Sequence, residues 1–130
     1  MDNKALIDMA LKAMENAYAP YSGFKVGAAL LCSDKKVYTG CNIENSSYGA
    51  SNCAERTAIF KAVSEGEREF EKIAIVSSSG DFTFPCGICR QVLSEFMYDK
   101  TVVLFSEKDG ISESKVKDLL PEAFRLQRGN

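Results

Sequence analysis

Histidine is absent from this chain of 130 residues, and its absence limits the chemistry open to the protein. Imidazole is the side chain that most often serves as a general base near neutral pH, and it is the commonest protein ligand of transition metals. Any acid–base or metal chemistry must therefore rest on carboxylates and thiolates.

An excess of basic residues is also missing, because 16 Lys and Arg residues face 18 Asp and Glu residues and the formal net charge is -2. Proteins that bind nucleic acids need clustered positive charge to neutralise phosphates. The chain contains no long basic run, so we expect no nucleic acid as a partner.

Long apolar runs are lacking too. No stretch approaches the roughly 18–20 apolar residues that span a bilayer, and the N-terminal Met1-Asp2-Asn3-Lys4 lacks the pattern of a secretory signal. We therefore expect a cytoplasmic protein with no membrane partner. In the reducing cytosol the five cysteines, an odd number, are better explained as metal ligands or core residues than as a disulfide framework.

The residues that are present have the composition of one soluble domain, with 45% hydrophobic and 26% charged residues. Apolar spacing and turn residues predict helices and strands that alternate along a single domain, residues 1–130. The predicted helices are Leu6–Tyr18, Ala54–Val63, Ile88–Met97 and Ser114–Leu120, and the predicted strands are Phe24–Cys32, Val37–Glu44, Ile73–Ser77 and Thr101–Phe105. This order predicts an α/β fold with helices layered on a mixed sheet whose later strands are parallel.

Two polar residues stand out in the second predicted strand. Side chains alternate between the two faces of a strand, so Asn42 and Glu44 are expected to point the same way. Taken alone, the pair also fits an ordinary solvated strand face.

Three cysteines fall at or near the predicted starts of two helices: Cys53 before the second, and Cys86 and Cys89 at the third. Helix N-termini carry a partial positive charge that lowers thiol pKa values and favours thiolate ligands. Zinc with three protein ligands keeps a fourth position open, as catalytic zinc sites do. The sequence therefore predicts one Zn²⁺ per chain on these three thiolates.

Glu55 follows Cys53 closely enough to act on a water held by the metal, and it supplies a base where no histidine exists. Arg56 comes next. Three thiolates on a divalent cation leave a net negative centre, which is a poor Lewis acid, so we expect the Arg56 guanidinium to compensate the sulfur charge.

Each of these residues has a structural alternative. Asn52 and Glu55 also fit a helix capping box. A purely structural zinc would need a fourth thiolate from Cys32 or Cys41, although both cysteines also fit a buried core as small hydrophobes.

The joint pattern resembles a known family. Cys53-Ala54-Glu55 followed by Pro85-Cys86-Gly87-Ile88-Cys89 is similar to the zinc-deaminase signature. Further blocks, in family order and spread over most of the chain, resemble the small homotetrameric cytidine deaminases. These blocks are Pro20-Tyr21-Ser22-Gly23-Phe24, Val26-Gly27-Ala28-Ala29, Asn42-Ile43-Glu44-Asn45, Cys53-Ala54-Glu55-Arg56, Cys86-Gly87-Ile88-Cys89-Arg90-Gln91 and Leu119-Leu120-Pro121 with Phe124.

The resemblance implies a three-layer α/β/α fold with zinc on the three cysteines. It implies that the substrate is bound by six residues, some of them across subunit boundaries of a homotetramer. These are Phe24, Asn42, Glu44, Tyr48, Ala54 and Phe124. Taken singly, Phe24 also fits a core ring and Phe124 a plug over the core. Ser46 stands where small alanine is frequent in the family, which bears on the contacts of the loop that carries Tyr48.

The reaction implied by the resemblance is hydrolytic deamination of cytidine and 2′-deoxycytidine to uridine and 2′-deoxyuridine with release of ammonia, as in pyrimidine salvage. Zinc would activate the water and Glu55 would shuttle protons. Two alternatives stay open: a related deaminase acting on a nucleoside antibiotic such as blasticidin S, a free base or a polynucleotide, and a non-catalytic binding module that zinc stabilises.

Overall fold

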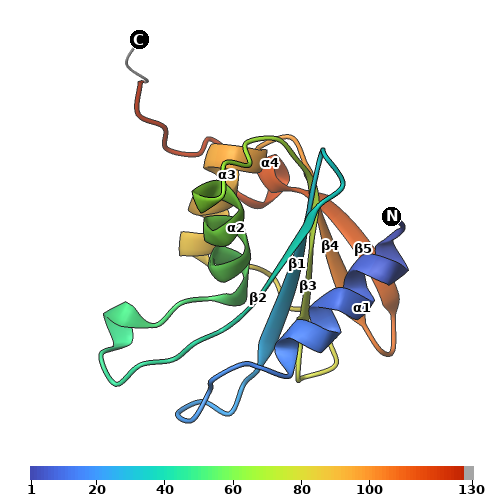
Figure 1. Ribbon diagram of the computed structural model, residues 1–130, viewed down its shortest axis with the longest axis vertical. Helices are drawn as coiled ribbons and strands as arrows, with labels where there is room; N and C mark the ends of the chain where they lie inside the picture. The colour runs from blue at the N-terminus through green and yellow to red at the C-terminus, as the bar shows by residue number, and fades with distance from the viewer. Residues whose placement is uncertain (128–130) are drawn as a thin grey trace.

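A five-stranded mixed sheet forms the centre of the computed structural model, which describes residues 1–127 (Figure 1). The sheet has the order β2-β1-β3-β4-β5. Its strands are β1 Val26–Cys32, β2 Val37–Cys41, β3 Phe70–Ser77, β4 Thr101–Ser106 and β5 Gly110–Lys115. β1 pairs antiparallel with β2 and β3, whereas β3 and β4 are parallel and joined by a helical crossover. The predicted mixed sheet is confirmed.

Helices cover both faces of this sheet. α1 (Asn3–Met14) packs on one face, and α2 (Ala54–Ser64) and α3 (Gly87–Met97) pack on the other (Figure 1). The interior strand β1 is buried at all seven positions because it has a hydrophobic layer on each side. The three-layer α/β/α architecture is therefore confirmed. No helix within residues 1–127 is long and apolar enough to cross a membrane. The predicted domain end at residue 130 lies outside the described residues.

The first helix is shorter than the apolar spacing predicts. Asp2 caps it by accepting a hydrogen bond from the Ala5 amide at 2.8 Å, but it ends at Met14 rather than at Tyr18. Tyr18 instead pairs with the segment after β2, where its amide donates to the Asn42 carbonyl at 3.0 Å. A long-range backbone pairing thus overrides the local helical pattern.

The C-terminal part of the prediction is wrong at one element. Residues 110–115 form the edge strand β5, antiparallel to β4, and only the short α4 (Val116–Leu119) follows it. β5 alternates between half-buried and exposed positions. Because nearly all of its side chains are polar, its sequence lacks the apolar alternation that predicts a strand.

A glycine sets how closely α2 approaches the sheet. A Cβ atom on Gly40 of β2 would lie 2.5 Å from the Ala54 carbonyl oxygen and 2.6 Å from the Ala58 amide nitrogen. Only glycine admits that contact. The first turn of α2 is therefore held directly against β2.

Candidate active site

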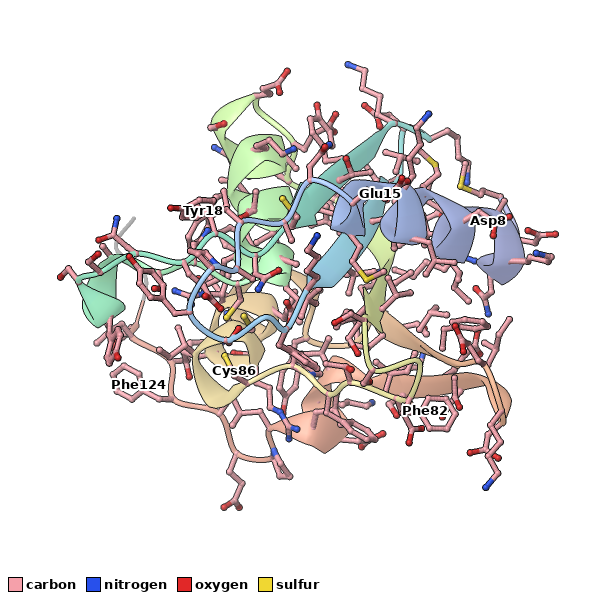
Figure 2. The ribbon with its side chains drawn as sticks, turned by 90° about the horizontal axis from the view of Figure 1, so that it is seen from below. Asp8, Glu15, Tyr18, Phe82, Cys86 and Phe124 are labelled. Atoms are coloured by element: carbon pink, nitrogen blue, oxygen red, sulfur yellow. The ribbon has the colours of Figure 1, made fainter. Side chains whose placement is uncertain are left out.

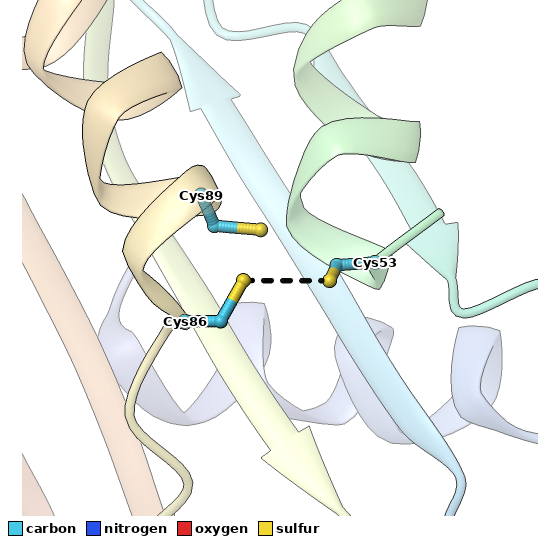
Figure 3. A group of neighbouring side chains, drawn as sticks. All are labelled: Cys53, Cys86 and Cys89. Carbon is cyan, nitrogen blue, oxygen red and sulfur yellow. Dashed lines mark hydrogen bonds between the residues drawn. The ribbon is translucent and has the colours of Figure 1, made fainter. Parts of the chain in front are cut away.

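Three cysteine thiols converge where α2 and α3 begin (Figure 3). Cys53 is the N-cap of α2, Cys86 is the N-cap of α3, and Cys89 lies in the first turn of α3. Their sulfur atoms lie within 4.8 Å of one another, and the Sγ atoms of Cys53 and Cys86 are 3.6 Å apart. Sulfurs around a tetrahedral zinc are about 3.8 Å apart, given a Zn–S bond of about 2.3 Å. The predicted ligand set is brought together with a spacing that fits zinc.

The thiols share charge unequally. A hydrogen bond with Cys89, together with the Arg56 guanidinium, lowers the pKa of Cys53 to about 5 against the opposing effect of burial. The same hydrogen bond with Cys53, and burial, raise the pKa of Cys89. We take the pair as one thiolate and one thiol that share a proton, so a bound metal would displace that proton.

Arg56 lies directly against this charge. Its Nη2 atom donates to the Cys53 sulfur at 3.3 Å. Burial alone would lower the pKa of Arg56, but the hydrogen bonds to Cys53 and Cys89 raise it. The Arg56 Nε atom is buried without a hydrogen-bond partner among residues 1–127, so the guanidinium depends on these sulfurs for compensation. This placement agrees with the expected electrostatic role.

Glu55 is only 4% exposed and lies beside the thiols in the first turn of α2. Burial raises its pKa to about 7. The capping-box alternative is wrong, because Cys53 is the N-cap of α2 with no side-chain cap bond and Asn52 donates instead to Thr57. A carboxyl group with a pKa near neutrality can both accept and release a proton at working pH.

A pocket of about 230 Å³ opens beside Cys53, Glu55 and Cys86. Of the residues that the resemblance implies in substrate binding, three line it: Phe24, Asn42 and Ala54. Sequence reasoning missed three further lining residues: Val26, Thr83 and Phe84. Phe84 directly precedes Pro85 of the cysteine motif, and that adjacency was the available signal.

Asn42 holds the wall of this pocket in place. Its Oδ1 accepts from the Val26 amide and its Nδ2 donates to the Phe24 carbonyl, both at 2.8 Å. A primary amide has two donor hydrogens and two acceptor lone pairs, so one of each remains for a ligand.

Glu44 lies in a neighbouring outer pocket of about 460 Å³ rather than beside the thiols. Its carboxylate accepts from the Tyr21 amide at 3.0 Å, from the Ser22 amide at 3.1 Å and from the Ser22 hydroxyl. These bonds, above all that of the Ser22 hydroxyl, lower the pKa of Glu44. β2 ends at Cys41, so Asn42 and Glu44 follow the strand and do not share one pocket as a common face would predict.

Tyr48 and Phe124 stand apart from the thiols. Tyr48 is 83% exposed and lines the outer pocket. Phe124 is 68% exposed, and its carbonyl accepts from the Gln91 side chain at 3.0 Å. Figure 2 shows Phe124 at the periphery, with Cys86 nearer the centre of the view. Phe124 is therefore no plug over the core.

The four-thiolate alternative does not fit this geometry. Within residues 1–127, neither Cys32 nor Cys41 joins the group of Cys53, Cys86 and Cys89. Three thiolates would leave a fourth position open on a tetrahedral metal, and the pocket that Cys53 and Cys86 line also contains the buried carboxyl group of Glu55.

Comparison with known proteins agrees with this site. Residues 1–105 match the family described as the cytidine and deoxycytidylate deaminase zinc-binding region. The cytidine deaminase of Sporosarcina psychrophila is 53% identical over 95% of this chain and 92% of its own, and that of Halalkalibacterium halodurans is 50% identical over 100% and 99%. The crystal structure of cytidine deaminase from Burkholderia pseudomallei superposes with a TM-score of 0.91 at 50% identity, covering 95% of this chain and 100% of that one.

The match covers the motif that supplies the three thiols and the buried carboxyl group, and its zinc-binding description agrees with the sulfur geometry. The chain belongs to the cytidine and deoxycytidylate deaminase family, as a zinc-dependent hydrolytic deaminase.

Proposed function

We propose that this protein deaminates cytidine and 2′-deoxycytidine, with water as the second substrate and uridine or 2′-deoxyuridine and ammonia as products. One observation carries the proposal: a group of three thiols, open on one side, adjoins a pocket in which the carboxyl of Glu55 has a pKa of about 7. The names of the related enzymes support cytidine as the base-bearing substrate.

Cys53, Cys86 and Cys89 would hold the zinc, and the bound metal would supply Lewis acidity that makes water a nucleophile at neutral pH. Glu55 would take a proton from that water and deliver it to N3 of the pyrimidine ring. The water oxygen would add to C4 as N3 is protonated. Glu55 would then carry the second proton, from the new C4 hydroxyl, to the exocyclic amino group, which leaves as ammonia as the C4–N bond breaks and the C4 carbonyl forms. A carboxyl with a near-neutral pKa suits both transfers.

The other residues would position the substrate. Phe24, 41% exposed, offers an aromatic face to the base, and buried Ala54 forms the adjoining wall. The free donor and acceptor of Asn42 would meet a sugar hydroxyl. Glu44 in the outer pocket would bind the far end of the sugar.

We further propose a homotetramer in which Tyr48 and Phe124 complete the sites of neighbouring subunits. Their exposure supports this, since large apolar side chains that project from a small protein gain by burial between subunits. A cytoplasmic location stays a prediction of the sequence. Light scattering tests the assembly: a monomer of 14.3 kDa that still turned over substrate would contradict it.

The proposed reaction is tested by the fall in ultraviolet absorbance of the aminopyrimidine. The zinc-loaded protein is mixed in turn with cytidine, 2′-deoxycytidine, cytosine and blasticidin S. We expect both nucleosides, but not cytosine, to be consumed. Glu55→Gln should lose activity by at least roughly 10²–10⁴-fold while it keeps the zinc of the cysteine trio, because it removes only the proton carrier.

Two results would contradict these roles. Near-full activity in Glu55→Gln would remove Glu55 from the proton path. A zinc-loaded protein that consumed none of the substrates would favour the non-catalytic binding module.

A further inference from the structure

A second group of metal-ligating side chains lies near the opposite end of α2 from the cysteine trio. Cys32 ends β1, Asp34 lies in the turn to β2, and Glu67 lies in the loop between α2 and β3. The Cys32 sulfur and one oxygen of each carboxylate lie within 4.8 Å of one another. α2 has 11 residues and is therefore about 16 Å long, which separates the two groups. In Figure 1 the β1–β2 turn is at the top, and the loop that enters β1 is at the bottom.

The backbone fixes this group. The Cys32 amide donates to the Lys36 carbonyl at 2.9 Å and closes the turn, and the Ser33 amide donates to the Glu69 carbonyl at 3.0 Å. The second bond ties the turn to the loop that carries Glu67. The Asp34 side chain caps the same turn by accepting from the Lys36 amide at 3.0 Å. The three ligand atoms are thus held close together by segments that pair independently of any ion.

The group is short of positive charge. Lys35, its neighbour in sequence, is paired with Glu71 at 2.6 Å, and no ion pair involves Asp34 or Glu67 within residues 1–127. The Tyr38 hydroxyl donates to Glu67 at 3.3 Å, which is a neutral contact. The Lys36 amide, and then a hydrogen bond with Glu67, lower the pKa of Asp34. Without a cation, the two carboxyl groups are therefore held together by a shared proton that a bound cation would replace.

The Cys32 thiol is the buried member. Cys32 has no exposed surface, and its sulfur has no hydrogen-bond partner in the described part of the chain, although it lies beside both carboxylates. Burial, then Glu67 and Asp34, raise the pKa of this thiol to about 11, while Lys36 acts weakly in the other direction. The acidic surroundings thus oppose ionisation of the thiol and leave its sulfur without a hydrogen-bond partner in the described residues.

We propose that Cys32, Asp34 and Glu67 form a second divalent-cation site, suited to zinc or cadmium and separate from the catalytic one. One thiolate and two carboxylates match a borderline-soft cation, whereas magnesium and calcium prefer oxygen alone. Water would fill the remaining position. Binding would release the thiol proton and neutralise the carboxylates. It would also link the β1–β2 turn to the α2–β3 loop through the cation, which would stabilise the folded chain.

The test is equilibrium dialysis of the full-length protein against zinc, with the metal counted per chain. We expect two zinc ions in the wild type and one in Glu67→Ala and in Cys32→Ala. Matched controls are Glu69→Ala, a carboxylate beside the site, and Cys41→Ala, a half-exposed thiol outside both groups. Both controls should keep two. Because Cys32 is buried and its loss can unfold the chain, half-buried Glu67 is the decisive position.

Cadmium gives a second readout. After zinc has filled the cysteine trio, added cadmium should produce a thiolate-to-cadmium charge-transfer band whose intensity corresponds to one thiolate. This band should vanish in Cys32→Ala, and excess magnesium should leave it unchanged. Saturation of the wild type at one metal per chain, or two metals in Glu67→Ala, would overturn the proposal. Neither result bears on deamination, which is measured separately with zinc in the trio alone.

Discussion

Cys53 and Cys32 lie near opposite ends of α2, and the same side chain behaves in opposite ways at the two places. At the start of the helix, the pKa of Cys53 is lowered to about 5 by Cys89 and Arg56. Beyond its end, the pKa of Cys32 is raised to about 11 by burial, Glu67 and Asp34. Burial alone does not explain the contrast, because it raises the pKa of both thiols. The neighbouring groups, which donate hydrogen bonds to Cys53 and are acidic around Cys32, account for the difference.

The difference shows what makes a thiol ready for a metal. At the N-terminus of α2, hydrogen bonds from Cys89 and from the Arg56 guanidinium stabilise negative charge on Cys53 before any metal arrives. Beyond its C-terminus, burial and the acidic groups of Glu67 and Asp34 oppose negative charge on Cys32. At the first place a metal would meet one thiolate, that of Cys53, before it displaced a proton, whereas at the second place it would have to create its only thiolate.

The largest expected effect comes from removing one ligand of the cysteine trio at the start of α2. We expect Cys53→Ala to lose deaminase activity and the zinc of the cysteine trio, and to unfold at a lower temperature, because thiolate-rich zinc sites contribute on the order of 10 kcal/mol at neutral pH. Metal analysis and thermal unfolding measure this. The half-exposed Cys41→Ala is the control, and a Cys53→Ala protein that bound as much zinc as the wild type would contradict the three-thiolate site.

A smaller effect should come from Glu55 in the metal-free protein. Its pKa rises from the ordinary 4.5 to about 7 on folding, so the folded state keeps a proton that the unfolded chain releases. The stability from this proton is present at low pH and is lost as the pH rises from 4.5 to about 7.

We therefore expect metal-free Glu55→Gln to gain on the order of 3 kcal/mol over metal-free wild type across that interval. Urea unfolding at several pH values measures the gain. Because Cys53 titrates in both proteins, only their difference is informative. Parallel stability curves would show that burial does not perturb Glu55.

Arg56→Gln should weaken the stabilisation of the Cys53 thiolate without removing a ligand of the cysteine trio. Loss of the charged hydrogen bond should raise the pKa of Cys53 and lower turnover about 10-fold, equivalent to about 1.4 kcal/mol. Thiolate absorbance against pH in the metal-free protein measures the pKa directly. Arg68→Gln is matched, since its guanidinium donates to the Val63 carbonyl at the other end of α2. Equal effects of both variants would point to general destabilisation.

The smallest effect is expected at Arg90, which braces the second helix of the trio. Its Nε donates to the Pro85 carbonyl at 2.7 Å and its Nη1 to the Leu119 carbonyl at 2.8 Å. Arg90→Lys keeps the positive charge but cannot donate to both carbonyls as the planar guanidinium does. We therefore expect the free energy of unfolding to fall by about 1 kcal/mol, with one zinc retained in the trio. Chemical unfolding and metal analysis measure this. Loss of the zinc would instead make Arg90 a determinant of the metal geometry.

The sequence predicted the cysteine trio and Glu55 well because they depend on local structure. Cys53, Cys86 and Cys89 owe their positions to two helix starts that spacing and Pro85 already indicated. The mixed sheet with parallel later strands followed from the alternation of elements, and β3 and β4 are parallel. The edge strand β5 was missed because its polar alternation resembles a loop.

What the sequence could not predict depends on long-range pairing. Asn42 and Glu44 separate into two pockets because Tyr18 and Asn52 pair with Ile43 between them. The grouping of Cys32 with Glu67 depends on the pairing of β1 with β3, and no periodicity reports that contact.

The two hydrogen bonds by which Asn42 holds Phe24 and Val26 have a thermodynamic consequence for ligand binding. The loop is ordered by the fold itself, so a nucleoside would meet a wall whose conformational entropy was already lost during folding. Preorganisation of this kind leaves more of the contact energy to appear as affinity and correct orientation. Asn42→Ala would release the loop, and the lost rigidity would weaken binding beyond the one hydrogen bond removed.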